Sequence, residues 1–307
     1  MAQPSLPYYS LNRFLKSHFG EPVKKIPVDA GLGCPNRDGT KGKGGCIYCD
    51  PLGSGTGLSL KGLSVEEQVK LFLKKFEGSK RFKKFLIYFQ SFCNTYAPVK
   101  KLKELYDVVK IDPRIVGLCI GTRPDCVDEE VVKLLKSYQE KGYFLWVELG
   151  LQSKHDTTLN LINRGHTFAD FLKGYTLLKK AGIPVVVHII YGLPGETKEM
   201  MLETARALAD LRVDGVKFHA LYVVKGTKMA SLYLSGKYKP LELEEYVELV
   251  AKSLTLLPPE TVIHRLCSEA SADQILAPLW VTKKMEVVNK IQDFMRKNQL
   301  YQGLHFK

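Results

Sequence analysis

The stretch CPNRDGTKGKGGCIYC, residues 34–49, holds three of the seven cysteines of this 307-residue chain. It follows an apolar strand candidate at 25–29 and lies in a cysteine- and glycine-rich loop that we expect over 31–63. In a chain without an export signal, clustered cysteines favour metal or redox chemistry over a disulfide framework. The other four are scattered and form no C-x-x-C pair: Cys93, Cys119, Cys126 and Cys267.

Outward from this loop, short apolar segments alternate with amphipathic helical ones. Strands are expected at 25–29, 85–90, 116–122, 145–152, 184–193 and 215–223. Helices are expected at 64–76, 99–109, 128–141, 168–181, 197–211 and 241–257. Ser64 with Glu67 predicts a capping box, Thr167 an N-cap, and Gly142 and Gly182 helix ends. Near-continuous apolar strands between helices indicate a parallel sheet covered by helices.

Two architectures suit six strand–helix units. An open doubly wound sheet usually carries a GxGxxG fingerprint after its first strand, and this chain has none. Polar residues instead end successive strands, as in barrel enzymes. We therefore predict an α/β fold, a partial (βα)6 TIM-like barrel with a C-terminal helical extension. The expected parts are an N-terminal extension (1–20), the barrel core (21–235) and a C-terminal extension (236–307) with another possible strand at 261–266.

Composition excludes several classes. Hydrophobic residues make up 45% and charged residues 25%, which are ordinary values for a packed globular protein and exclude a disordered or fibrous chain. The longest apolar stretch, 184–194, is about ten residues and contains His188, whereas a spanning helix needs roughly 20. The N-terminus shows no signal-peptide pattern. We therefore expect a cytoplasmic protein without a membrane partner.

The spacing Cys34-x11-Cys46-x2-Cys49 supplies three thiolates without an evident fourth ligand. A structural zinc site usually closes with four protein ligands, and the nearest histidines are His18 and His155. A cubane iron–sulfur cluster bound by three cysteines leaves one iron open for an external ligand. The spacing favours the cluster. Zinc with a distant ligand, or incidental cysteines, are the alternatives.

The motif CPNRDGT-x3-GGCIYC resembles the radical S-adenosylmethionine (radical SAM) superfamily, and within it the YhcC/YtqA branch related to elongator-type proteins. The resemblance covers nearly the whole chain. The commonest superfamily spacing is C-x3-C-x2-C, but this branch has the longer first gap. Further blocks follow in the expected order: YFQSFCNTYAPV (88–99), GTRPDCV (121–127), LWVELGLQS (145–153), INRGH (162–166), HIIYGLPGE (188–196), KFHALYVVKGT (217–227), PPETVIHR (258–265) and YQG (301–303).

The resemblance implies two cofactors, a [4Fe-4S] cluster and S-adenosylmethionine (SAM). Cys34, Cys46 and Cys49 would bind the cluster. The amine and carboxylate of SAM would bind the open iron, and reductive cleavage would give a 5′-deoxyadenosyl radical. A reducing electron donor such as flavodoxin or ferredoxin is then required.

The resemblance also implies cofactor-binding residues. Tyr48, before the third cysteine, would touch the adenine or cover the cluster, although a loop aromatic packed in the core is the alternative. Gln90 ends the second strand, where the superfamily often has a Gly-Gly-Glu-like segment, so its role at the SAM amine carries over only weakly. Thr122 and Arg123 end the third strand, where ribose or carboxylate contacts are typical.

The fourth and fifth strands add further candidates. Glu148 lies among apolar residues, so its burial would be expensive without a partner. SAM, Arg123 or Arg164 would supply that partner, and a purely structural Glu–Arg pair is the alternative. Arg164 would also pair with the SAM carboxylate as a planar fork. His188 and Leu193 would flank the adenine.

Glu148, His188, His219 and Cys93 are the candidate catalytic residues. His219 is expected on the substrate side, although a lone histidine is more often a satisfied structural group. Cys93 follows the second strand and would donate hydrogen to a substrate radical, with an inert buried thiol as the alternative. Cys119, inside a strand, is expected in the core.

The net charge is 45 − 32 = +13 and the pI is about 9.2, which favours a polyanionic partner. Elongator-type relatives act on the wobble uridine of tRNA. The leading hypothesis is therefore a radical SAM enzyme that modifies the 5-aminomethyl-type side chain of that uridine. The alternatives are radical chemistry on a small metabolite and a non-enzymatic, metal-bearing RNA-binding protein. About four irons and four sulfides per chain would support the enzyme, and one zinc would exclude it.

Replacing Cys34, Cys46 or Cys49 with Ala should each abolish SAM cleavage, because three thiolates are needed to hold the cubane and leave one iron open. Cys119→Ala is the control, and it should cost about 1 kcal/mol of packing at most. The measurement is anaerobic 5′-deoxyadenosine release under dithionite. A Cys46→Ala protein that cleaves SAM near the parent rate would show that the cluster loop is misassigned.

Overall fold

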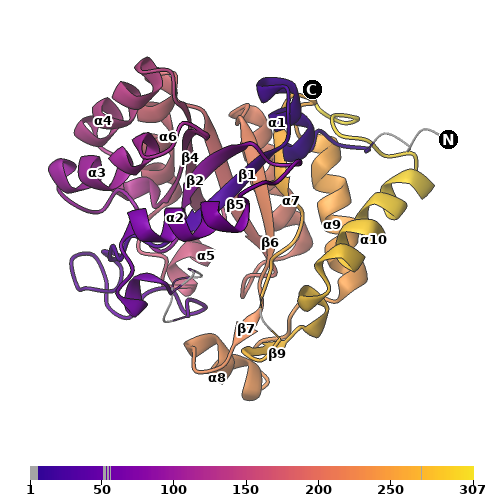
Figure 1. Ribbon diagram of the computed structural model, residues 1–307. Helices are drawn as coiled ribbons and strands as arrows, with labels where there is room; N and C mark the ends of the chain where they lie inside the picture. Colours follow the sequence, from indigo (N-terminus) through magenta and orange to yellow (C-terminus); the bar gives the residue numbers. More distant parts are fainter. Residues whose placement is uncertain (1–5, 51–52, 54, 56, 271) are drawn as a thin grey trace.

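A computed structural model describes residues 6–50, 53, 55, 57–270 and 272–307 (Figure 1). The first five residues of the predicted N-terminal extension and four positions of the predicted cysteine loop therefore lie outside the described residues. Among the described residues, parallel strands form one curled, open sheet in the order β1-β2-β3-β4-β5-β6-β8. They are β1 (Val23–Val28), β2 (Lys84–Phe89), β3 (Ile115–Thr122), β4 (Phe144–Gln152), β5 (Val185–Tyr191), β6 (Gly215–Ala220) and β8 (Val262–Arg265).

Helices between successive strands cover the outer face of the sheet (Figure 1). These are α2 (Val65–Lys75), α3 (Val99–Tyr106), α4 (Glu129–Glu140), α6 (Phe168–Lys180), α7 (Lys198–Asp210) and α9 (Leu243–Leu256). Ser64 and Glu67 form the predicted capping box, and Thr167 is the N-cap of α6. Gly142 and Gly182 take the positive φ angles, 86° and 70°, that end α4 and α6. The predicted partial barrel is confirmed.

The structure adds one strand to the six predicted units. The possible strand at 261–266 is β8, and it pairs in parallel with β6, where Lys217 lies beside Arg265. A segment of the predicted C-terminal extension is thus part of the barrel sheet itself. The extension also contains α10 (Lys284–Lys297), which packs on α9, and β9 (Ile275–Ala277), which pairs with β7 (Val223–Val224).

The N-terminal segment closes one end of the barrel. Helix α1 (Leu11–Phe19) begins at Ser10, whose hydroxyl caps it, and ends at Gly20 in the left-handed region. Leu15 packs with Leu86, Trp146 and other residues of the sheet's inner face. In Figure 1 α1 lies at one end of the strands, whereas α8 (Lys228–Leu234) lies at the other end with β7 and β9. The barrel interior is therefore plugged at the amino ends of its strands.

Gln302, in the closing YQG block, joins the two ends of the chain. Its Oε1 accepts from the backbone N–H of Tyr9 at 2.8 Å. Its Nε2 donates to the carbonyls of Pro258 at 2.6 Å and Thr261 at 2.8 Å. The side chain is buried. These bonds fix the N-terminal segment beside the loop that leads into β8.

In the part of the chain that the structure describes, no helix combines the length and the apolar character needed to cross a bilayer.

Gln302→Ala should lower the free energy of unfolding by about 2–4 kcal/mol, because three buried backbone groups lose their partner. Gln274→Ala is the matched control, since Gln274 is exposed, and it should change stability by less than about 0.5 kcal/mol. Urea unfolding followed by circular dichroism measures both. Equal stability of the two variants would contradict this role for Gln302.

Candidate active site

A cavity of about 250 Å³ opens at the carboxyl ends of the strands. Its walls come from the cysteine loop, from β2 to β6 and from the end of β8. The structure brings most of the sequence-predicted site residues together in these walls: Cys34, Cys46, Tyr48, Cys49, Gln90, Thr122, Arg123, Glu148, Arg164, His188 and His219. Cys93 and Leu193 are not part of the described lining.

The cysteine loop is held by the segment 162–166, which carries the INRGH block. The backbone N–H of Ile47 donates to the carbonyl of Ile162 at 3.0 Å. Asn163 Nδ2 donates to the carbonyl of Gly45 at 2.7 Å, and Asn36 Nδ2 donates to the carbonyl of Asn163 at 2.6 Å. Two segments that lie more than a hundred residues apart in sequence thus form one scaffold around the cysteines.

Asn36 occupies a narrow space in this scaffold. A Cβ atom added at Gly42 or at Gly165 would collide with its side-chain oxygen. Gly165 also has a φ of 71°, which side-chain-bearing residues rarely adopt. The glycine of the INRGH block is therefore required for the close approach of the two segments.

The sulfur of Cys46 receives two side-chain donors. Asn36 Nδ2 lies 3.8 Å and Arg164 Nη1 lies 3.7 Å from Cys46 Sγ. Burial, followed by the neighbouring Cys46 sulfur, raises the pKa of Cys49 to about 12. Donors aimed at a ligand sulfur are the outer-shell contacts that tune iron–sulfur clusters.

The three cysteines fit a cluster. Within the described residues, no three cysteine, histidine or acidic side chains converge as a single metal ion would require. A cubane does not require that convergence, because each of its cysteines binds a different iron. All three cysteines line one cavity and Cys46 has two donors, an arrangement that a cluster could use, and their assignment as its ligands stays a prediction.

Arg164 is oriented by several acceptors besides the sulfur. Its Nη2 donates to the carbonyl of Gly150 at 2.7 Å, and its Nε donates to His166 Nε2 at 2.9 Å. The acceptor role of Nε2 places the proton of neutral His166 on Nδ1, which lies 3.2 Å from the carbonyl of Thr167. Contact between Arg164 and a SAM carboxylate stays a prediction.

Arg123 positions the same segment from the opposite side. Its Nε and Nη2 form a fork with Asp125 at 2.9 Å each, and Nη1 donates to the carbonyl of Arg164 at 2.8 Å. Its side chain is 2% exposed. The described contacts make Arg123 a support for the 164–165 backbone, and its predicted contact with the cofactor is untested.

Cys93 lies behind the cavity wall. It is fully buried, and its Sγ lies 3.1 Å from Thr122 Oγ1, which in turn lies 2.6 Å from Thr95 Oγ1. A hydrogen donor must reach the substrate radical, and this thiol faces a threonine of the wall instead. This geometry favours the alternative of a buried thiol, and the predicted hydrogen donation by Cys93 stays untested.

Tyr48 lines the cavity and packs with Leu193 in one small apolar cluster. Leu193 is buried in that cluster, so it supports the wall from behind. Leu193 is therefore not among the described residues that line the cavity, and its predicted contact with the adenine stays untested. Tyr48 is partly buried, and its predicted contact with the adenine or the cluster stays untested.

Glu148 is the centre of a second group of contacts, deeper in the barrel. Its carboxylate accepts from the ammonium groups of Lys217 and Lys25, the latter at 3.1 Å. It also accepts from His188 Nε2 at 2.9 Å and Trp146 Nε1 at 3.1 Å. The partner of Glu148 is thus neither Arg123 nor Arg164, because Arg123 pairs with Asp125 and Arg164 donates to Gly150, His166 and Cys46.

Burial and neighbouring charges shift the pKa values of Glu148, Lys217 and His188. Burial alone would raise the pKa of Glu148, but Lys217 and Lys25 hold it well below its usual range. Burial, together with repulsion from the charges of Lys25 and Arg265, lowers the pKa of Lys217 to about 7. The attraction of Glu148 offsets only part of this shift. Burial and the charge of Lys217 lower the pKa of His188 to about 4, so His188 is neutral and donates.

The sequence analysis missed the roles of Lys25 and Lys217. Lys25 begins the expected strand at 25–29 and Lys217 lies in the expected strand at 215–223, but neither is among the predicted site residues. The sequence did contain a signal for Lys217. It lies two residues before His219, and alternate residues of a strand share one face, so both side chains were predictable on the same side of the sheet. The ring centroids of His219 and His188 lie 5.2 Å apart, and His219 Nε2 is buried without a partner among the described residues.

Glu148→Gln should lower the free energy of unfolding by about 3–5 kcal/mol, because two ammonium groups in the barrel lose their shared counter-charge. Glu269→Gln is the control, with a side chain that is 62% exposed. Adding Lys217→Met to Glu148→Gln should recover part of the loss, since it removes one uncompensated charge. Chemical denaturation measures all three, and a double variant no more stable than Glu148→Gln would contradict the shared-carboxylate account.

Comparison with known proteins places this geometry in a family. Residues 31–208 match the model of the radical SAM superfamily, and residues 213–297 match a radical SAM C-terminal domain. The chain is 41% identical to YtqA of Bacillus subtilis (strain 168) over 300 residues, covering 98% of this chain and 93% of that protein. It is 40% identical to YhcC of Escherichia coli (strain K12) over 266 residues, covering 87% and 85%.

More distant relatives include a tRNA uridine(34) acetyltransferase of Methanocaldococcus infernus, 31% identical over 209 residues, covering 66% of this chain and 38% of that protein. The solved structure of the archaeal Methanocaldococcus infernus Elp3 with an N-terminal deletion matches with a TM-score of 0.70 at 21% identity. The match covers 92% of this chain and 64% of that chain, and it shows the shared fold. The chain therefore belongs to the radical SAM superfamily, in the YhcC/YtqA-like branch related to the elongator proteins.

Proposed function

We propose that this radical SAM enzyme modifies the wobble uridine of tRNA, at a 5-aminomethyl-type side chain. The observation that carries the proposal is the 31% identity with a protein named tRNA uridine(34) acetyltransferase over 66% of this chain. This chain spans only 38% of that relative, so acetyl transfer is not part of the proposal. The net charge of +13 supports a polyanionic substrate.

As a member of the radical SAM family, the chain uses a [4Fe-4S] cluster and SAM. When bound, these cofactors supply reductive cleavage to a 5′-deoxyadenosyl radical, which abstracts a hydrogen atom from the substrate. We assign Cys34, Cys46 and Cys49 to the cluster, with Asn36 and Arg164 donating toward the Cys46 sulfur. The plug at the amino ends of the strands limits the access of water from that end, which protects radical chemistry from side reactions.

Other residues of the cavity act on the substrate side in this proposal. Neutral His219 presents an unpartnered, buried Nε2 that is suited to a hydrogen bond with a substrate group. His188 donates to Glu148 at 2.9 Å, and its ring lies tilted beside that of His219, so it positions that neighbour. Lys217, held by Glu148 and by Tyr88 Oη at 3.0 Å, places a basic group in the wall of the same cavity.

The electron donor in this proposal is a small acidic carrier such as flavodoxin or ferredoxin. Cys34 and Cys49 are partly exposed, so the cluster loop reaches the surface. Lys41 and Lys43 are exposed on the same loop. Positive charge around a surface-near redox centre favours the encounter with an acidic partner.

The modified nucleosides of tRNA from cells with and without the gene test the proposal. Loss of the gene should deplete one wobble-uridine derivative and accumulate its precursor, measured by liquid chromatography and mass spectrometry. The wild-type gene and Cys119→Ala should restore the profile, whereas Cys46→Ala should not. An unchanged nucleoside profile would contradict the proposal and redirect the search to small metabolites.

A further inference from the structure

The barrel sheet is open, and a groove follows its opening. In the observed strand order, β1 and β8 are the two edges of the sheet. A groove of about 760 Å³ lies between these edge strands, with further walls from the α1 segment, α2 and α10. We name it the β1–β8 groove. It shares Tyr88, Gln90, Lys217 and Arg265 with the cavity that holds the cysteines, so the two spaces meet at these residues.

Basic residues dominate the described lining of the β1–β8 groove. The lining contains one acidic residue, Glu269, and five basic ones, of which two share the carboxylate of Glu148 (Lys25 and Lys217) and three do not (Lys24, Arg265 and Lys284). Lys284 lies 2.7 Å and Arg265 lies 3.7 Å from the carboxylate of Glu269, so two cations share it. The excess of positive charge is the electrostatic footprint of a polyanionic ligand.

Aromatic side chains also line the groove. Tyr8, Phe72 and Tyr88 contribute to the groove walls. Tyr88 and Lys217 belong to the lining of both the groove and the cavity, and the ammonium of Lys217 lies 4.4 Å from the ring centroid of Tyr88. Single-stranded nucleic acids bind grooves of this kind, with phosphates on basic residues and bases stacked on aromatic rings.

The groove edges are poorly suited to an added peptide strand. Pro27, which lines the groove on β1, has no backbone N–H to donate to a new partner. The opposite edge, β8, is only four residues long, and Tyr9 already accepts from the N–H of Ile263 at 2.8 Å. These features favour a ligand that binds through phosphates and bases over one that extends the sheet.

We propose that the β1–β8 groove docks a single-stranded segment of the RNA substrate. Its phosphates lie on Lys24, Arg265 and Lys284, and one base passes Tyr88 and Lys217 into the cavity. This inference rests on the proposed function and adds the docking surface and the entry route. It also gives the N-terminal and C-terminal segments a role, because both contribute groove walls.

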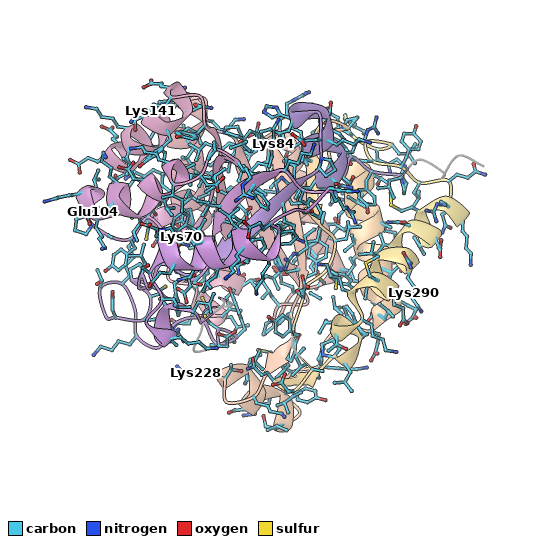
Figure 2. The ribbon with its side chains drawn as sticks, viewed as in Figure 1. Lys70, Lys84, Glu104, Lys141, Lys228 and Lys290 are labelled. Carbon is cyan, nitrogen blue, oxygen red and sulfur yellow. The ribbon has the colours of Figure 1, made fainter. Side chains whose placement is uncertain are left out.

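The test measures binding of a synthetic tRNA anticodon stem-loop at several salt concentrations by fluorescence anisotropy. Lys24→Gln and Lys284→Gln should each weaken binding about 3- to 10-fold and reduce the slope of log affinity against log salt by about 0.7, because each loses one phosphate contact. Lys141→Gln and Lys290→Gln are the controls, since these lysines lie on α4 and α10 surfaces outside the groove lining (Figure 2). The controls lose the same charge and should keep the wild-type slope.

The outcomes separate the two proposals. Binding by the wild type with groove variants that match the controls would overturn the docking groove and leave the wobble-uridine proposal standing. No binding of any stem-loop at low salt would overturn both. Displacement of the RNA by polyglutamate at equal charge concentration would also overturn the groove, because it would show a general acidic-polymer site. Thermal unfolding of each variant confirms that the lysine substitutions leave the fold intact.

Discussion

The carboxylate of Glu148 connects strands that the backbone does not connect. The sheet is open, so β1 and β6 have no backbone hydrogen bonds to each other. Lys25 on β1 and Lys217 on β6 nevertheless meet at Glu148 on β4, and His188 on β5 joins them. The half-barrel is therefore tied across its interior by one acidic side chain. Removing one partner from such a buried group costs more than the group contributes as a whole, because an uncompensated charge remains.

The barrel interior has two groups of contacts, one at the cysteine loop and one around Glu148. At one end, the segment 162–166 holds the cysteine loop and directs Arg164 toward Cys46. At the other end, Glu148 gathers the lysines that face the β1–β8 groove. The cavity lies between them, so a cofactor held by the cysteines and a substrate that enters by the groove would meet inside the barrel. Helix α1 closes the barrel at the amino ends of its strands.

Much of this arrangement could be predicted from sequence. The strand–helix rhythm, the caps at Ser64 and Thr167 and the cysteine spacing are local signals, and the structure confirms the fold that they predict. The burial of Glu148 was also predictable, because a lone carboxylate stands in an apolar strand. Its partners were not. Lys24 and Lys25 are adjacent on β1, and only the strand's orientation decides which of them faces the interior.

Other features depend on tertiary pairing. β8 is a short segment whose place beside β6 depends on how the chain returns to the sheet, and the sequence pattern identifies only its strand character. The sequence places Cys93 directly after a strand end. The direction of its side chain depends on packing against Thr122, which the sequence pattern does not show. Arg123 and Arg164 were identified as site residues, whereas their mutual support depends on contacts between separate loops.

A crystal structure of the anaerobically reconstituted protein with SAM tests the central claim most directly. The account predicts iron bound by Cys34, Cys46 and Cys49 alone among the protein's side chains, with Arg164 beside Cys46 and Glu148 still bridging Lys25 and Lys217. A cluster bound by Cys93 or Cys126, or a Glu148 carboxylate released from both lysines, would contradict it.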